Sequence, residues 1–283
     1  MACIHSFAND FERGMQPPAR AFVTSERDSQ RLFIGVSALL FLVCAGVTVV
    51  WCGSMSAMPG MSMQGGWTMS MAWMRRPGQS WIGAGGTFVA MWVVMMAAMM
   101  LPSLSAMLWR HRRALGWRRQ SRPGLLTAIA GAAYFFVWAL CGVGVFAVGA
   151  AIASAAMQWP VLAGTVPTAA GVVVLAAGAF QFTKWKDHHL ASCREEPMHV
   201  APAADPGSAW RHGLRLGRHC GLSCANLTAI LLVAGVMDLR AMAVVTIAIT
   251  AERIAPGGAR IARLVGAIAM SAGVLMFAGV VRL

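Results

Sequence analysis

The chain has 283 residues, of which 58% are hydrophobic and 12% charged, and its mean hydropathy is +0.64. A soluble globular domain carries about twice that charged fraction, so the composition excludes an ordinary soluble protein. The formal net charge is +13, but the basic residues stand in short segments between apolar runs. This is typical of loops beside a membrane rather than of a nucleic-acid-binding surface. We therefore expect a lipid bilayer, and no nucleic acid, as a partner.

Long uncharged stretches predict an all-α, polytopic membrane helix bundle of about seven transmembrane helices. The longest stretch, 123–183, has 61 residues without a charge; a helix that crosses the membrane needs roughly 20, so this stretch holds two spans. The sixth span is the weakest, because only eleven uncharged residues separate Arg240 from Glu252. An acid such as Glu252 near the end of a span tends to pair or to take part in function, but the adjacent Arg253 favours an anchor at the membrane interface. The predicted spans are 32–52, 83–108, 124–146, 164–183, 219–237, 239–254 and 264–281.

The distribution of Lys and Arg predicts the orientation of this bundle. With the N-terminus in the cytoplasm, 19 of the 23 Lys and Arg residues fall in segments on the inner side, as the positive-inside rule requires. We therefore expect a multi-pass protein of the cell inner membrane, with a cytoplasmic N-terminal segment at 1–31 and a membrane domain at 32–283. Within that domain, 53–80 form a Met-rich outer loop and 184–218 form a cytoplasmic loop.

The predicted outer loop, 53–80, contains seven methionines among many Gly and Ser residues. Such a composition cannot form a core and favours a flexible loop. Its M-x-M and M-x-x-M spacings resemble the Met-rich motifs of periplasmic copper-resistance proteins. Two interpretations stay open: a weak collector of Cu(I), or a low-complexity linker whose methionines lie against the bilayer surface.

The second predicted span carries five methionines in ten residues, and these form three overlapping M-x-x-x-M pairs. Residues four apart lie on one side of a helix, so the sulfur atoms share a broad face. Thioethers favour Cu(I) over harder ions, which makes this face a candidate metal path. Methionine is also an ordinary filler of apolar cores, so packing remains an alternative. We call this set the methionine face: Met91, Met95, Met96, Met99 and Met100.

Two pairs of possible metal ligands lie within the predicted cytoplasmic loop and directly after it. His189 and Cys193 are four residues apart, and so are Cys220 and Cys224, with His219 beside them. The cytoplasm is reducing, so these cysteines should remain thiols that are able to bind metal. Two Cys with one or two His is a ligand set for Cu(I) or zinc. We expect the two pairs to meet at the inner surface and to hold copper, with zinc as the alternative.

The chain also resembles a known bacterial family. The segment WVVMMAAMMLPS, at 92–103, is similar to the W-x-V-M-M-x-A-M-M-x-P-S signature of predicted metal-binding integral membrane proteins, a domain of unknown function. Later blocks agree in order: QFTKWK with LASCR, RHGL with CGLSC, AGVMDL, and ERIAPGG. The resemblance implies a helical membrane fold and metal binding. The family has Cys where this chain has His189, and a further Cys near Ser223, so the resemblance leaves the metal open.

Together these features predict a membrane protein, not an enzyme, that binds a soft metal ion and transfers or transports it. The expected ion is Cu(I), collected by the Met-rich loop, carried by the methionine face and received by the inner His and Cys residues. A soluble metal chaperone or another membrane subunit would be its partner. The alternative function is a membrane scaffold or assembly partner without metal, in which the methionines and cysteines are packing residues.

Overall fold

The structure is a computed structural model, and it describes residues 19–56, 60–63, 66–75, 78–117, 122–194 and 205–278. The chain divides into two compact units, Met1–Leu40 and Phe41–Leu283, and every site discussed below lies in the second. In chain order the elements are α2 (Ala19–Ser56), β1 (Met61–Ser62), β2 (Thr68–Met69), the 3-10 helix η1 (Met71–Trp73), α3 (Trp81–Trp117), α4 (Pro123–Gln158), α5 (Pro160–Phe180), α6 (Lys184–Arg194), α7 (Pro206–Ala234), α8 (Leu239–Ile254) and α9 (Gly258–Phe277).

The expected class of fold, an all-α polytopic bundle, is confirmed. Six of the described helices are long and apolar enough to cross a membrane, namely α2, α3, α4, α5, α7 and α9. The sixth predicted span corresponds to α8, which has 16 residues. At 1.5 Å per residue it measures about 24 Å, shorter than a hydrocarbon core of about 30 Å. Helix α8 is therefore the exception among the seven predicted spans, in agreement with its short uncharged stretch.

The segment 184–218, expected to be a loop, contains α6 and the beginning of α7. Helix α7 begins at Pro206, thirteen residues before the predicted start at 219, because Asp205 caps it. The Asp205 side chain accepts a hydrogen bond from the Ser208 backbone N–H at 3.1 Å, and the Asp205 backbone N–H donates to the Ser208 hydroxyl oxygen at 3.2 Å. This capping box stabilises the first turn. Cys220 consequently lies inside a long helix and not at the first turn of one, as the predicted start at 219 implied.

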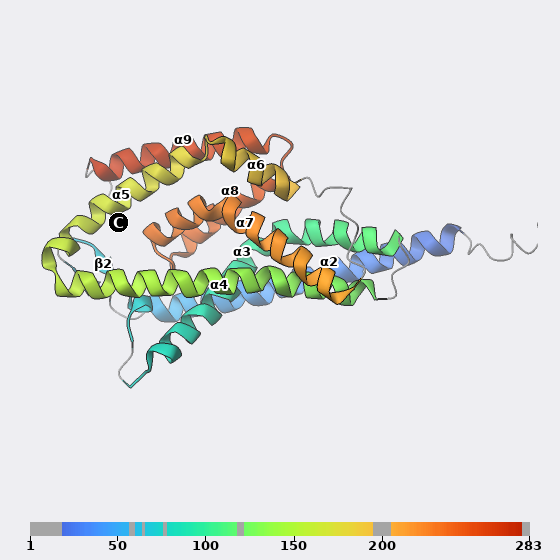
Figure 1. The fold of residues 1–283 in the computed structure, drawn as a ribbon, viewed down its shortest axis with the longest axis horizontal. Coiled ribbons are helices and arrows are strands. Elements are labelled where there is room, and N and C mark those ends of the chain that lie inside the picture. Colours follow the sequence, from blue (N-terminus) through green and yellow to red (C-terminus); the bar gives the residue numbers. More distant parts are fainter. Residues whose placement is uncertain are drawn as a thin grey trace, which may run out of the picture. The chain divides into compact units, whose positions relative to one another are not determined.

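Helix α7 packs closely against α4 (Figure 1), and glycine makes this approach possible. Gly213 and Gly217, one turn apart, face α4. A Cβ atom on Gly213 would overlap the carbonyl oxygen of Ala130, and one on Gly217 would lie 3.0 Å from the carbonyl oxygen of Tyr134. Small residues four apart allow membrane helices to pack backbone against backbone. This contact fixes α7 relative to Tyr134, a residue of the site described below.

We expect Gly213→Ala to destabilise the protein, because the new methyl group meets backbone that cannot yield. Overpacking of this kind costs about 1–3 kcal/mol. Unfolding in detergent, followed by circular dichroism while SDS is added, measures the change. The matched control is Gly221→Ala on the same helix, where a Cβ atom would meet nothing within 4 Å. Equal stability of the two variants would contradict the proposed role of Gly213 in helix packing.

Two short strands lie within the Met-rich segment. Strands β1 and β2 pair antiparallel, with Met61 opposite Met69. Met69 is buried against alanines of α4 and α5, and the Trp67 indole N–H donates to the Ala163 carbonyl at 2.9 Å. Figure 1 shows β2 beside the corner between α4 and α5. Within this segment, Met69 is therefore a packing residue.

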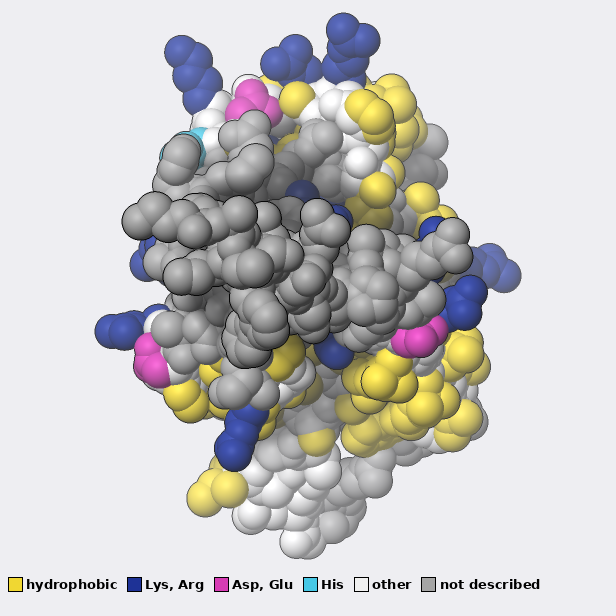
Figure 2. Space-filling view, turned by 90° about the vertical axis from the view of Figure 1, so that its right-hand side faces the viewer, with side chains coloured by type: hydrophobic (Ala, Val, Ile, Leu, Met, Phe, Trp, Pro, Cys, Tyr) yellow, Lys and Arg dark blue, Asp and Glu magenta, His cyan; other side chains and the backbone are white. Residues whose placement is uncertain are grey.

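The outer sides of the helices are apolar, as expected for a bundle in lipid. Leu140, Val143 and Ile152 of α4 are each more than half exposed, which would be unfavourable in water. Figure 2 shows the molecule from the right-hand side of Figure 1. Around the edge of the side seen in Figure 2, Lys and Arg side chains project outward, with hydrophobic side chains between them. The arrangement agrees with a protein embedded in a membrane.

Candidate functional site

The methionine face of α3 lies in the core of the protein. All five of its methionines are buried, and Met96 and Met100 have no exposed surface. They belong to one cluster with Cys220 and Cys224 of α7. Trp92 keeps α3 in place, because its indole N–H donates to the Trp138 carbonyl of α4 at 3.0 Å. The predicted sulfur-rich face is therefore turned toward the cysteines.

Cys220 is the centre of a group of polar and sulfur-containing side chains. Its Sγ atom lies 2.7 Å from the Tyr134 hydroxyl oxygen, 2.9 Å from Nη2 of Arg253 and 4.0 Å from Sδ of Met100. Cys224, one turn further along α7, donates its thiol to the Cys220 carbonyl at 2.9 Å. We call these five residues, from α3, α4, α7 and α8, the thiol site.

The hydrogen bonds distinguish the two cysteines chemically. A guanidinium can only donate, so the Cys220 sulfur accepts from Arg253. A positive charge at this distance stabilises a thiolate, which is the metal-binding form of cysteine. The Cys224 sulfur donates to a carbonyl and therefore carries its proton. Arg253 also lies 3.7 Å from the Cys224 sulfur and donates to the Ser223 hydroxyl at 3.1 Å, so one guanidinium spans the whole site.

A buried ion pair adjoins the thiol site. Lys186 Nζ lies 2.8 Å from Oε2 of Glu252, and the Gln181 side chain donates to Oε1 of Glu252, also at 2.8 Å. Lys186 also donates to the Ser223 carbonyl of α7. Lys186, Gln181 and Glu252 are all at most 2% exposed. The pair is neutral as a unit, and the Arg253 guanidinium is a positive charge that contacts both thiol sulfurs.

Four of these residues were missed as site residues by the sequence reasoning: Tyr134, Lys186, Glu252 and Arg253. The expectation that Glu252 and Arg253 anchor α8 at the interface is wrong, since they are 2% and 6% exposed. Both turn inward because each finds a partner there, Lys186 for the carboxylate and Cys220 for the guanidinium. The signal in the sequence was a pair of adjacent opposite charges at the end of an apolar helix. Their partners are distant in the chain: Cys220 lies 33 residues before Arg253, and Lys186 lies still further from Glu252.

The predicted histidines form a pair of their own. Nδ1 of His189 lies 3.2 Å from Nδ1 of His219. Burial lowers the pKa of the His189 imidazole below its ordinary value, and the charges of His188 and Arg218 lower it further. His189 is therefore neutral at neutral pH, which is the form that binds metal. Cys193 lies in α6, but its side chain is outside the described side chains.

The structure thus separates the predicted His and Cys ligands into two groups. His189 contacts His219, whereas Cys220 and Cys224 contact Met100 and Arg253. Within the described ranges, no three His, Cys, Asp or Glu side chains are grouped so that they could hold a metal ion. The cysteines instead have a thioether as their neighbour. Whether any of these residues binds metal stays a prediction.

In the comparison with protein families, residues 89–276 match the family described as copper chaperone, PpoB2. The match covers more than half of the chain and includes the methionine face and the thiol site. Comparison with curated proteins and with solved structures finds no match. The expectation of a metal-related bacterial family is supported, and copper is the metal in the family description. The chain belongs to the PpoB2 copper chaperone family.

Proposed function

We propose that the protein binds Cu(I) at the thiol site and passes it along the methionine face, a role of binding and transfer without catalysis. The observation that carries the proposal is the 4.0 Å distance between Cys220 Sγ and Met100 Sδ, where the methionine face meets a buried thiol. Metal–sulfur bonds are about 2.3 Å long, so two sulfurs on one ion are at most about 4.6 Å apart. At 4.0 Å the same bonds enclose an angle of about 120°, which suits a three-coordinate ion.

The donor set favours Cu(I) over zinc. Structural zinc takes four ligands from Cys, His, Asp or Glu, whereas the thiol site combines two cysteines with a thioether. Thioethers and thiolates together select Cu(I). Charge supports the same choice, because two thiolates, one Cu(I) and the Arg253 guanidinium sum to zero. A divalent ion in the same buried place would leave an excess positive charge, which is costly in an apolar interior.

The methionine face offers a path to and from this site. From Met91 to Met100 the chain advances nine residues, about 13.5 Å along the helix. The intervening methionines are buried and provide thioethers at successive turns. Neutral thioethers bind an ion weakly enough to release it, as transfer requires. We propose that the ion moves along this face in the inner membrane and is exchanged with a soluble metal chaperone or another membrane subunit.

The test is anaerobic titration of the detergent-purified protein with Cu(I), in competition with a chromophoric Cu(I) chelator. We expect the wild type to retain copper and Cys220→Ser/Cys224→Ser to lose the tightest equivalent, because both thiolates are gone. Cys141→Ser is the matched control: Cys141 is an exposed cysteine of α4, and its loss should leave binding unchanged.

Two results would overturn the proposal. The first is wild-type protein that retains no copper, which would favour the scaffold alternative with the methionines and cysteines as packing. The second is equal copper affinity in the wild type and Cys220→Ser/Cys224→Ser, which would place the metal elsewhere. Gel filtration of each variant shows that a loss of copper is not a loss of fold.

A further inference from the structure

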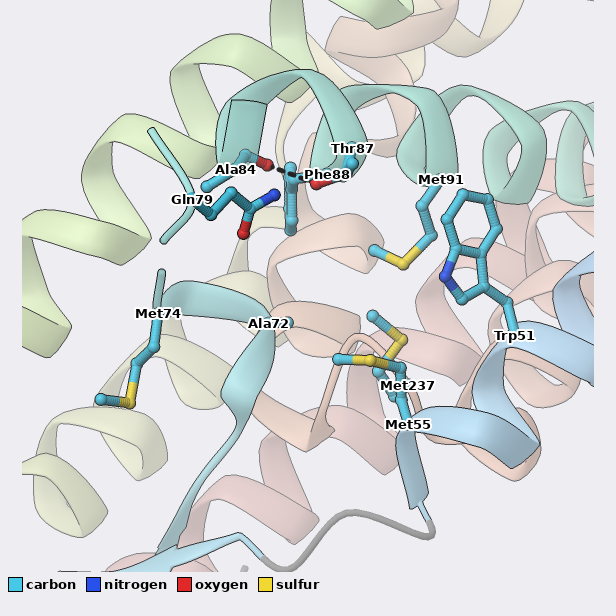
Figure 3. A pocket seen from close by; sticks show the side chains of 10 residues that line it. All are labelled: Trp51, Met55, Ala72, Met74, Gln79, Ala84, Thr87, Phe88, Met91 and Met237. Carbon is cyan, nitrogen blue, oxygen red and sulfur yellow. Dashed lines mark hydrogen bonds between the residues drawn. The ribbon is translucent and has the colours of Figure 1, made fainter. Parts of the chain in front are cut away.

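A cavity of about 130 Å³ lies where α2, α3 and the turn between α7 and α8 come together (Figure 3). One methionine from each of these segments lines it: Met55, Met91 and Met237. Figure 3 shows their sulfur atoms turned toward one another, whereas Met74, also in the wall, carries its sulfur apart from them. Met91 is buried and Met55 and Met237 are half-buried, so the cavity brings three thioethers together at one space.

A cysteine adds a stronger ligand to this group. Cys52, on α2 between two residues of the cavity wall, is 3% exposed, and its Sγ lies 4.0 Å from Sδ of Met237. The same distance separates Cys220 from Met100 in the thiol site. Since two metal–sulfur bonds of about 2.3 Å span 4.0 Å, one ion can bridge Cys52 and Met237 as well.

The cavity wall selects a soft ion with a single charge. Among the described residues that line it, none is Asp, Glu or His, so the wall offers no carboxylate or imidazole to a harder, divalent ion. Thioethers and a thiol suit Cu(I) and Ag(I). Trp51 places its ring beside Met91 (Figure 3), and the face of an indole ring attracts a cation. The wall also contains the Gln79 amide and the Thr87 hydroxyl, but the three thioethers and the thiol favour Cu(I) or Ag(I) over zinc and calcium.

We propose that Cys52, Met55, Met91 and Met237 form a second binding site for Cu(I) or Ag(I), which we call the thioether site. The proposal rests on the proposed function, because Met91 is also the first member of the methionine face that ends at the thiol site. The thioether site adds a second place where an ion can bind, at the end of the methionine face that is far from the thiol site. Cys52 and Met55 lie outside the residues that match the family, so membership of the family does not assign this site.

The experiment is anaerobic titration of the full chain in detergent with Ag(I), a redox-inert probe for a Cu(I) site. We compare the wild type with Met55→Leu/Met237→Leu, because leucine conserves the volume of methionine and removes only the sulfur. We expect this variant to bind one equivalent fewer than the wild type. Met74→Leu is the control, since Met74 lines the same cavity with its sulfur turned away, and it should bind as many equivalents as the wild type.

The variant Cys220→Ser/Cys224→Ser distinguishes the two proposals. If it alone loses silver, the proposed function stands and the thioether site is overturned. If only Met55→Leu/Met237→Leu loses silver, the thioether site stands and the thiol site is overturned. An equal loss in Met74→Leu would also overturn the thioether site, because the position of the sulfur would then be irrelevant.

X-ray absorption provides a measurement that does not depend on the folding of the methionine variants. Silver bound to Cys220→Ser/Cys224→Ser should show a nearest shell of sulfur alone, since the thioether site has no oxygen or nitrogen ligand among its four residues. A shell that contains oxygen or nitrogen would overturn the proposal.

Discussion

Lys186→Met is expected to destabilise the folded protein severely, because it removes one partner of a buried ion pair. Among the described residues, it leaves the buried Glu252 carboxylate with the Gln181 amide as its hydrogen-bond donor, whereas in the wild type Lys186 lies 2.8 Å away. Breaking a buried pair in this way costs about 3–5 kcal/mol, since the other charge is left uncompensated. The substitution also removes the hydrogen bond from Lys186 to the Ser223 carbonyl, which joins α6 to α7.

The loss can be measured as the shift of the SDS unfolding midpoint in detergent. Lys184→Met is the control, because Lys184 lies two residues earlier on the same helix and is exposed. The double variant Lys186→Met/Glu252→Gln should recover most of the stability, since it removes both charges and keeps a hydrogen-bond partner for Gln181. A double variant as unstable as Lys186→Met would show that the charge of Glu252 is not the cause.

Arg253→Gln is expected to weaken Cu(I) binding by about 10–100-fold, the usual effect of removing a residue that supports metal ligands. The reason is the charge of the thiol site. With Arg253 present, two thiolates and one Cu(I) form a neutral group. Without it, the same group is left with a net negative charge in a buried place. Glutamine removes the positive charge and keeps an uncharged hydrogen-bond donor on the side chain.

A competition titration with a chromophoric Cu(I) chelator measures the affinity, and Arg260→Gln, an exposed arginine on α9, is the control. The wild type should also release about one proton for each ion bound, because Cys224 must lose its proton to become a ligand. Unchanged affinity in Arg253→Gln, after gel filtration has confirmed its fold, would show that the guanidinium does not balance the loaded site.

Local patterns in the sequence were sufficient to predict the membrane bundle and the methionine face. A transmembrane helix makes all of its backbone hydrogen bonds within one segment, so hydropathy alone indicates where it lies. The spacing of Met91, Met95 and Met99 places them on one side of any helix that includes them. Neither conclusion depends on which other helices are nearby, and both agree with the structure.

Helix boundaries were less predictable where charge and apolar character mix. Residues 206–218 carry three arginines, so hydropathy alone placed them in a loop, yet the capping box at Asp205 and Ser208 begins a helix there. The boundaries of α8 were predicted well: the helix Leu239–Ile254 has the same bounds as the predicted span. The burial of Met69 was not predicted, because it depends on alanines of α4 and α5.

The sequence by itself determined a methionine-lined helix and a cysteine pair, but only the tertiary structure decided that they meet. Met100 and Cys220 are 120 residues apart in the chain, and their contact depends on how α3 and α7 each pack against α4. Arg253 and Tyr134 enter the same site from two further helices. No local pattern records the rotation of one helix against another, because that rotation is set by close packing at residues such as Gly213.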